Sequence, residues 1–221
     1  MQGLEKSINT CLSVATRLDI EEVAKAKRFL TKNYKNRYSL SPHLTYMISP
    51  FPEYNLKEAE LELDKYFKNQ KRFTFKLSKL GFEPVRKFYS LPVMDGQVMK
   101  LHKDMLKLLN KYRDGHIREK DVTRIERGEI SNKEIGYIKK YGYFRVLDNF
   151  TPHLTVGSVE AEDSEIPTVT KKLKRLLSSV LQGNIQVNEV LVNFHTDSEN
   201  QSEMKSIWEK KYKLKKPYLP G

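Results

Sequence analysis

Hydrophobic and polar residues alternate along this chain with two periods, one typical of strands and one typical of helices. A period of two predicts strands over 10–18, 73–80, 85–93 and 141–147, and one or two more within 184–195. Apolar residues three or four positions apart predict helices over 19–34, 55–67, 97–112, 167–183 and 202–212. Because strands and helices are interleaved, we predict a mixed α+β fold.

One short sequence occurs once in each half of the chain. Residues 41–46 read SPHLTY and residues 151–156 read TPHLTV, so the two histidines are 153 − 43 = 110 positions apart. In each copy a proline, which favours extended backbone, precedes a β-prone run. Within a strand His43 and Thr45 share one face, as do His153 and Thr155. Each copy therefore presents an imidazole beside a hydroxyl, and the repeat indicates a diffuse internal duplication.

Two histidines fit general acid–base chemistry at a phosphate ester. The ordinary pKa of imidazole, about 6.5, lets one ring accept a proton near neutrality while another donates one. Cleavage without a metal needs both rings, together with hydrogen-bond donors for the non-bridging phosphate oxygens. We predict His43 and His153 as base and acid, in an order that the sequence does not assign. Thr45 and Thr155 would bind the phosphate.

Two other interpretations of these histidines stay open. They could lie on the solvated face of a sheet, since antiparallel sheets often expose one face. They could also bind a metal, although two histidines are too few ligands for a tight site and no HExxH, HxH or HD sequence supplies more. The glycine patterns of nucleotide-binding loops and the GxSxG motif are absent as well, so we expect no metal and no cofactor.

The composition favours an anionic partner. Lysine and arginine number 40 against 28 aspartate and glutamate, a net charge of +12 that suits nucleic acid, nucleotides or phosphorylated surfaces, although surface lysines can serve solubility alone. No apolar run has the length of a membrane span, and residues 1–10 lack the apolar segment of a secretory signal. The single cysteine, Cys11, fits a reducing compartment. We expect a cytoplasmic protein without membrane contact.

One segment has no counterpart in the first half of the chain. Residues 114–140, approximately, are polar and dense in charge, and we interpret them as an insertion with short helices. Both a flap over the site and an ordinary solvated loop fit this composition.

The paired PHLT sequences resemble the 2H phosphoesterase superfamily, whose members carry two H-x-[ST]-x motifs and include the 2′-5′ RNA ligase-like proteins (RNA 2′,3′-cyclic phosphodiesterases). His43, Thr45, His153 and Thr155 match these motifs residue by residue. The resemblance implies one bilobal domain over 1–221, with two antiparallel-rich sheets flanking a central cleft and helices on the outside. It also implies metal-independent chemistry on 2′,3′-cyclic or 2′-5′ phosphodiester ends. RNA or a nucleotide with a cyclic phosphate would be the partner, and we expect a monomer.

The second motif departs from the ligase-like branch, in which a basic residue often follows the motif. Here Gly157 and Ser158 follow it. Arg145 or Arg17 could substitute for the basic residue, and Tyr143 could stack on a base. The ordinary alternative, a surface position for each arginine and core packing for Tyr143, is the one that composition alone favours.

Two alternatives to a hydrolase stay open. A basic RNA-binding module that keeps the cleft without turnover would bind RNA in a salt-sensitive manner. The reverse reaction, with a 5′-hydroxyl as nucleophile, would ligate RNA. Of the other histidines, we interpret His102 as a helix-surface residue and His195 as a residue at the rim of the cleft.

Overall fold

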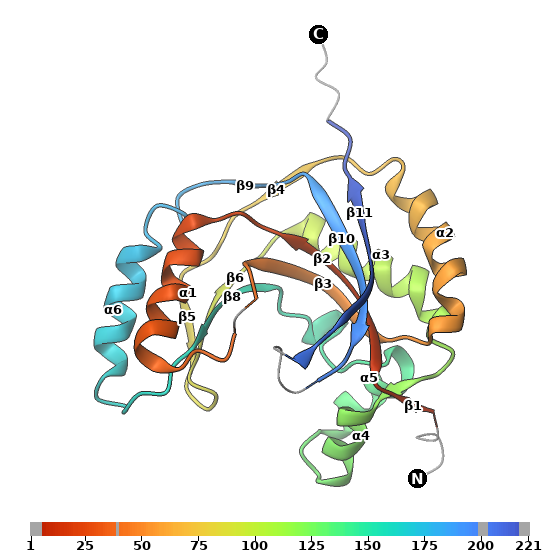
Figure 1. Cartoon of the computed structure of the whole chain (residues 1–221), viewed down its shortest axis with the longest axis horizontal. Coiled ribbons are helices and arrows are strands. Elements are labelled where there is room, and N and C mark those ends of the chain that lie inside the picture. Colours follow the sequence, from red (N-terminus) through yellow and green to blue (C-terminus); the bar gives the residue numbers. More distant parts are fainter. Residues whose placement is uncertain (1–5, 39, 199–202, 217–221) are drawn as a thin grey trace.

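The computed structural model describes residues 6–38, 40–198 and 203–216 (Figure 1). The helices are α1 Glu21–Tyr34, α2 Leu56–Phe67, α3 Gly96–Leu109, α4 Glu119–Glu126, α5 Asn132–Tyr141 and α6 Ile166–Leu176. The strands are β1 Ser7–Ile8, β2 Thr10–Arg17, β3 His43–Pro50, β4 Phe73–Phe75, β5 Gly81–Glu83, β6 Phe88–Pro92, β7 Ile117–Arg118, β8 His153–Ser158, β9 Ile185–Val187, β10 Glu189–Thr196 and β11 Ser206–Lys213. Short 3-10 turns cover η1 Glu53–Asn55, η2 Asn110–Arg113 and η3 Leu147–Asn149.

Seven strands form an antiparallel sheet in the order β11-β10-β2-β3-β8-β6-β5. The sheet has two halves, β11 to β3 and β8 to β5, which are joined through the single residue pair Leu44–Leu154. The two motif strands, β3 and β8, therefore meet at the centre of the molecule. The structure confirms the α+β fold with two antiparallel halves, and it shows that the halves are hydrogen-bonded to each other at their junction.

The two halves repeat one local irregularity. The pairing of β3 with β2 skips Tyr46, which is an extra residue and makes a β-bulge. The pairing of β8 with β6 skips Val156 in the same way. Each bulge directly follows the threonine of its motif. Because Leu44 and Leu154 hold equivalent positions and pair antiparallel, a local twofold relation passes between β3 and β8.

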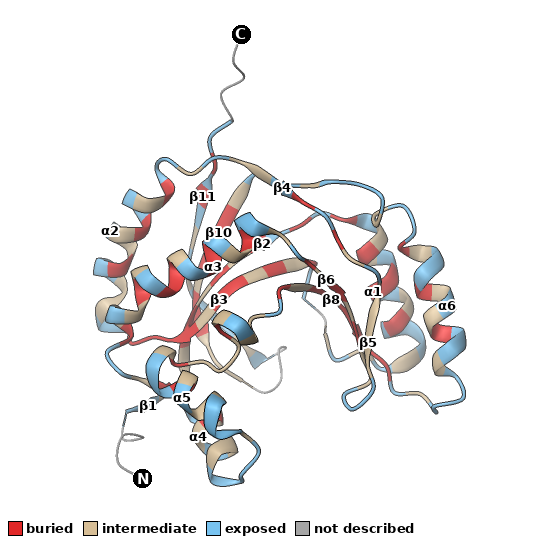
Figure 2. Ribbon diagram, turned by 180° about the vertical axis from the view of Figure 1, so that it is seen from behind, coloured by how far each residue is buried: buried red, intermediate tan, exposed pale blue. Residues whose placement is uncertain are grey.

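Helices cover the two halves of the sheet, with α1 and α6 on the half that contains β8 and α2 and α3 on the half that contains β3 (Figure 1). Figure 2 shows their buried positions on the sides that face the sheet. α3 begins where the Asp95 side chain accepts hydrogen bonds from two backbone N–H groups. Its apolar stripe of Val98, Leu101, Met105 and Leu109 is buried, and α3 packs on β3. The motif strand thus has a packed apolar side, and its histidine and threonine lie on the other side.

The charged segment 114–140 contains the short helices expected of it, α4 and α5. Its strand β7 pairs in parallel with β1. The guanidinium group of Arg113 donates hydrogen bonds to the carbonyls of Lys139 and Lys140, at 3.0 and 3.2 Å, and so holds the last turn of α5. The helix ends at Gly142, whose φ of 76° favours glycine. Specific backbone contacts therefore fix this segment to the body of the protein.

Two predicted elements are wrong. No strand forms over 141–147, because α5 ends there and the next residues face the cavity described below instead of alternating between two faces. The predicted last helix over 202–212 is wrong, because its residues 206–212 belong to the edge strand β11; residue 202 lies outside the described residues. Trp208 and Tyr212 are four positions apart, a spacing that places them on one face of either a helix or a strand. Ile207 on this strand is 49% exposed.

Other predicted elements are shorter than expected. β4 ends at Phe75, β6 covers Phe88–Pro92 where 85–93 was expected, α3 ends at Leu109 and α6 ends at Leu176. None of the helices within the described ranges is long and apolar enough to span a membrane.

Candidate active site

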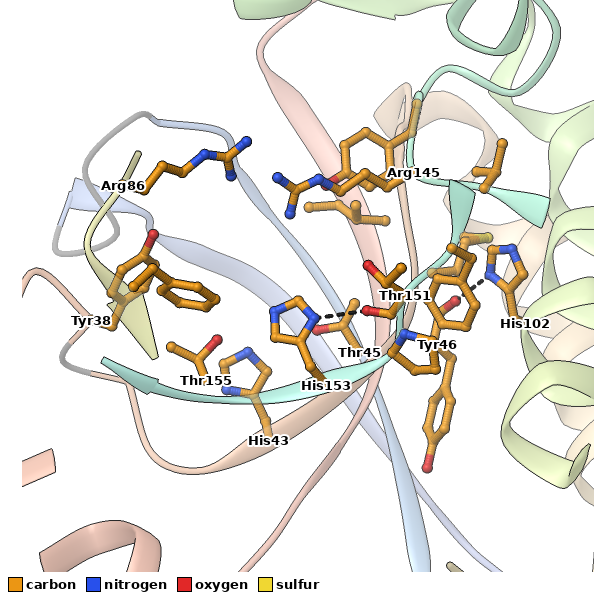
Figure 3. A pocket seen from close by; sticks show the side chains of 17 residues that line it. Tyr38, His43, Thr45, Tyr46, Arg86, His102, Arg145, Thr151, His153 and Thr155 are labelled. Atoms are coloured by element: carbon orange, nitrogen blue, oxygen red, sulfur yellow. Dashed lines mark hydrogen bonds between the residues drawn. The ribbon is translucent and has the colours of Figure 1, made fainter. Parts of the chain in front are cut away.

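Both His-x-Thr copies line one cavity of about 230 Å³ (Figure 3). His43 and Thr45 reach it from β3, and His153 and Thr155 reach it from β8. Of the residues that line it in the described part of the chain, none is acidic. The structure therefore brings together the four side chains that the sequence pattern singled out.

The strand register places each motif histidine beside the threonine of the other copy. Because β3 and β8 pair antiparallel at the motif leucines, His43 lies opposite Thr155 and Thr45 lies opposite His153. Figure 3 shows this arrangement, with the two histidine–threonine pairs side by side. The site is thus two equivalent halves that face a shared space.

Each motif histidine is oriented by a backbone carbonyl two residues earlier in the chain. The Nδ1–H of His43 donates to the carbonyl of Ser41 at 2.9 Å, and the Nδ1–H of His153 donates to the carbonyl of Thr151 at 2.8 Å. These bonds leave Nε2 of both rings to act in the cavity. A neutral imidazole in this state offers Nε2 as a base, and a protonated one offers it as an acid.

Burial lowers the pKa of both motif histidines below the ordinary value of 6.5. The hydrogen bonds to the backbone carbonyls raise the two pKa values and so offset part of the effect of burial. Nearby positive charge lowers them further, from Lys27 at His43 and from Arg145 at His153. Both rings therefore favour the neutral state in the free protein, and a bound anion would favour their protonated state.

The residues that follow the second motif position a cavity-lining tyrosine. Asn36 Oδ1 accepts the backbone N–H of Tyr38 at 3.0 Å and that of Ser158 at 3.1 Å, while Ser158 Oγ accepts the N–H of Arg37 at 2.9 Å. Asn36 can approach because Gly157 has no side chain: a Cβ there would lie 2.7 Å from Asn36 Oδ1, and φ is 151°. Gly157 and Ser158 thus hold the segment that carries Tyr38.

The other predicted substrate contacts differ in position. Arg145 and Tyr143 line the cavity, whereas Arg17 lines an adjacent hollow of about 410 Å³ and pairs with Glu209 at 2.7 Å. The guanidinium group of Arg118 lies over the Tyr143 ring, 4.4 Å from its centre. Their roles as substrate contacts stay predictions.

Two residues of the cavity were missed or misjudged. Arg86, in the turn after β5, has no sequence feature that separates it from other surface arginines. His102 is buried, not on the helix surface as predicted: its Nδ1–H donates to the carbonyl of Tyr46 at 2.7 Å, and its Nε2 accepts the N–H of Leu147 at 3.0 Å. Its ring stacks on Phe150 at 3.7 Å. His102 lies four positions after Val98 of the α3 stripe, and this spacing could have predicted that the histidine is buried.

No group of three or more His, Cys, Asp or Glu side chains in the described ranges is arranged to hold a metal ion. The cavity is lined by the imidazoles and hydroxyls of the two His-x-Thr copies and by the guanidinium groups of Arg86 and Arg145. Such a set can transfer protons and bind an anion.

Several solved structures have a similar fold over most of this chain. One phosphoesterase superimposes with a TM-score of 0.52 at 12% identity, over 94% of this chain and 99% of that chain. LigT of E. coli, in its complex with 3′-AMP, gives 0.51 at 14% identity, over 94% and 99%. LigT complexed with phosphate gives 0.50 at 15% identity, over 92% and 96%. At these identities the likeness concerns the fold, and the fold is the one expected of a 2H phosphoesterase.

The sequence itself places the chain in a family. The family described as "Protein of unknown function (DUF1045)" matches residues 50–202, more than half of the chain, and the chain belongs to it. The matched range includes the second His-x-Thr copy and begins after the first. No curated protein matches the sequence.

Proposed function

We propose that this protein is a metal-independent phosphodiesterase that opens 2′,3′-cyclic phosphates at RNA ends or on nucleotides. The observation that carries the proposal is the convergence of His43, Thr45, His153 and Thr155 on one cavity, which has no acidic residue among its described lining residues. The complexes of LigT with phosphate and with 3′-AMP, in a protein of the same fold, support a nucleotide phosphate as the ligand.

The proposed reaction uses the two imidazoles in opposite protonation states. The neutral ring takes a proton from water at Nε2 while the water oxygen forms a bond to phosphorus. The bond from phosphorus to one ribose oxygen breaks, and the protonated ring gives its Nε2 proton to that oxygen. The product is a phosphomonoester with a free ribose hydroxyl.

The threonines have a separate part in this reaction. The hydroxyls of Thr45 and Thr155 donate hydrogen bonds to the non-bridging oxygens, where negative charge increases as the transition state forms. Because these hydroxyls carry no charge, they can bind the phosphate without favouring either protonation state of the two histidine rings.

The test is turnover of cytidine 2′,3′-cyclic phosphate in the presence of EDTA. The wild-type protein should hydrolyse it, and His43→Ala and His153→Ala should each lower kcat by about 10²–10⁴-fold, the usual contribution of a general acid or base. His116→Ala is the matched control, because His116 does not line the cavity. Undiminished turnover in either motif variant, or turnover that EDTA abolishes, contradicts the proposal.

The same assay separates two alternatives. A basic RNA-binding module would bind RNA with strong salt dependence, show no turnover and be indifferent to a terminal cyclic phosphate. A ligase would form a phosphodiester from the cyclic phosphate and a 5′-hydroxyl, with the same two histidines required, and would be detected as a longer RNA product.

A further inference from the structure

Two arginines from separate segments converge on the opening of the cavity. Arg86 lies in the turn between β5 and β6, and Arg145 lies in the segment between α5 and β8. Both line the cavity, and Figure 3 shows their guanidinium groups facing each other across it. Neither belongs to the His-x-Thr copies.

The charges of these two arginines are weakly compensated within the protein. Arg86 has one solvent-exposed contact with Glu83, at 3.6 Å. No described carboxylate forms an ion pair with Arg145, and Glu134 interacts with it only at longer range. Two cations that share one space repel each other, and an anion between them offsets this repulsion because it attracts both. The arrangement is therefore complementary to an anion.

The same arginines also line a groove that the motif side chains do not reach. This groove of about 840 Å³ passes over the charged segment 114–140, and no motif histidine or threonine lines it. Two other cations in its wall are closely paired: Arg118 with Asp121 at 2.7 Å, and Lys120 with Asp197 at 2.6 Å. The weakly compensated positive charge of Arg86 and Arg145 thus lies where the groove meets the cavity.

We propose that Arg86 and Arg145 clamp a second phosphate of the substrate, one nucleoside away from the phosphodiester that reacts. The inference rests on the proposed function, in which the reacting phosphate already has four motif side chains as partners. A guanidinium group suits this task because its planar N–H groups bind two phosphate oxygens together. Tyr38 and Tyr143 line both hollows, so they would contact the nucleoside between the two phosphates.

The substrate class that follows is a 2′,3′-cyclic phosphate nucleotide with a phosphate on its 5′ oxygen. That second phosphate has two sources: a terminal 5′-monophosphate, or the phosphodiester that precedes the last nucleotide of an RNA chain. Three substrates distinguish them, namely cytidine 2′,3′-cyclic phosphate, its 5′-phosphorylated form, and the dinucleotide ApC with a terminal cyclic phosphate.

The experiment measures kcat/KM for each substrate. We expect a preference of about tenfold or more for at least one substrate with a second phosphate, the effect of one or two charge-assisted hydrogen bonds. In Arg86→Ala and in Arg145→Ala, the ratio of kcat/KM between the preferred substrate and cytidine 2′,3′-cyclic phosphate should fall toward one. The main cause should be a higher KM for the preferred substrate. Arg28→Ala is the matched control, because it removes an exposed arginine on α1 that pairs with Glu21. Which substrate shows the preference identifies the source of the phosphate.

Two results would overturn the clamp. One is equal kcat/KM for all three substrates in the wild-type protein, with the histidine dependence intact. The other is an arginine variant that lowers all three values by the same factor, because the guanidinium group would then bind the reacting phosphate.

A binding measurement keeps this inference separate from the proposed function. Calorimetric titration should show tighter binding of adenosine 3′,5′-bisphosphate than of 3′-AMP, and the difference should disappear in Arg86→Ala and Arg145→Ala. If no cyclic phosphate is hydrolysed but this difference is found, the phosphodiesterase fails and the anion clamp stands. Equal affinity of the wild-type protein for the two nucleotides overturns the clamp.

Discussion

At the scale of single residues, the backbone determines which ring nitrogen of His43 and His153 faces the cavity. Each Nδ1–H is held by a carbonyl two residues earlier, so both rings present the same nitrogen to the cavity. Burial lowers the pKa of each ring below 6.5. The proposed acid therefore loses its proton, in the free protein, as the pH rises toward neutrality.

This gives a prediction for the pH dependence of catalysis. The profile of kcat/KM reports the free protein and should be bell-shaped, with its maximum on the acid side of 6.5 and a fall toward pH 8. The fall of kcat on the alkaline side should occur at a higher pH than the fall of kcat/KM, because the bound phosphate stabilises the imidazolium ion and raises its pKa. Steady-state rates from pH 4.5 to 8.5 measure both. A kcat/KM that is constant or rising between pH 6.5 and 8 would be inconsistent with the proposed acid.

His102 affects stability through the two hydrogen bonds of its ring. His102→Leu leaves the carbonyl of Tyr46 and the N–H of Leu147 without this partner, which should lower the free energy of unfolding by about 2–4 kcal/mol. His102→Gln can keep the acceptor for Leu147 and should lose less. Urea denaturation measures both variants. Equal stability of all three proteins would show that these bonds contribute nothing.

The pH dependence of stability gives a second readout for His102. Burial lowers its pKa in the folded state below 6.5, and protonation would remove the Nε2 acceptor. The unfolded chain therefore binds more protons below pH 6.5, so the wild-type protein should lose stability as the pH falls through this range. In His102→Leu this part of the slope should be absent.

At the scale of elements, Gly157 couples the second motif strand to the segment before the first. Gly157→Ala would place a Cβ 2.7 Å from Asn36 Oδ1 at a φ of 151°, which should lower the free energy of unfolding by about 1–3 kcal/mol. It should also raise KM, because Tyr38 would be displaced. Gly136→Ala is the matched control: nothing lies within 4 Å of its Cβ in helix α5, so about 0.5–1 kcal/mol of stabilisation is expected. Thermal melts and KM measure both, and an unchanged Tm and KM for Gly157→Ala would refute the coupling.

The elements that the sequence predicts well are those in which one face is plainly buried. The α3 stripe and the strand that begins at Thr10 follow their periods, and both are observed. The edge strand β11 was predicted as a helix because Trp208 and Tyr212 fit both periods, and only pairing with β10 decides between them. The period of two over 141–147 predicts a strand, but Tyr143, Arg145 and Val146 line the cavity instead of alternating between two sheet faces.

At the scale of the whole molecule, the internal duplication makes the centre of the site predictable. Two copies of one short sequence imply two equivalent strands, and a twofold relation brings them together. Arg86 and Tyr38 lie outside the repeat and reach the cavity through turns whose paths depend on tertiary contacts. His102 could have been placed by its spacing, but its two hydrogen-bond partners come from distant segments. The repeat therefore predicts the four motif residues and not their surroundings.

Histidine ring NMR during titration with inorganic phosphate shows whether the imidazoles of His43 and His153 bind one phosphate. The signals of His43 and His153, assigned with the alanine variants, should shift with a single Kd, and the pKa of both rings should rise. His43→Ala should weaken the response of His153, and His153→Ala that of His43, while His116 stays unaffected. A response from only one ring, or two independent responses with different Kd values, would contradict the account.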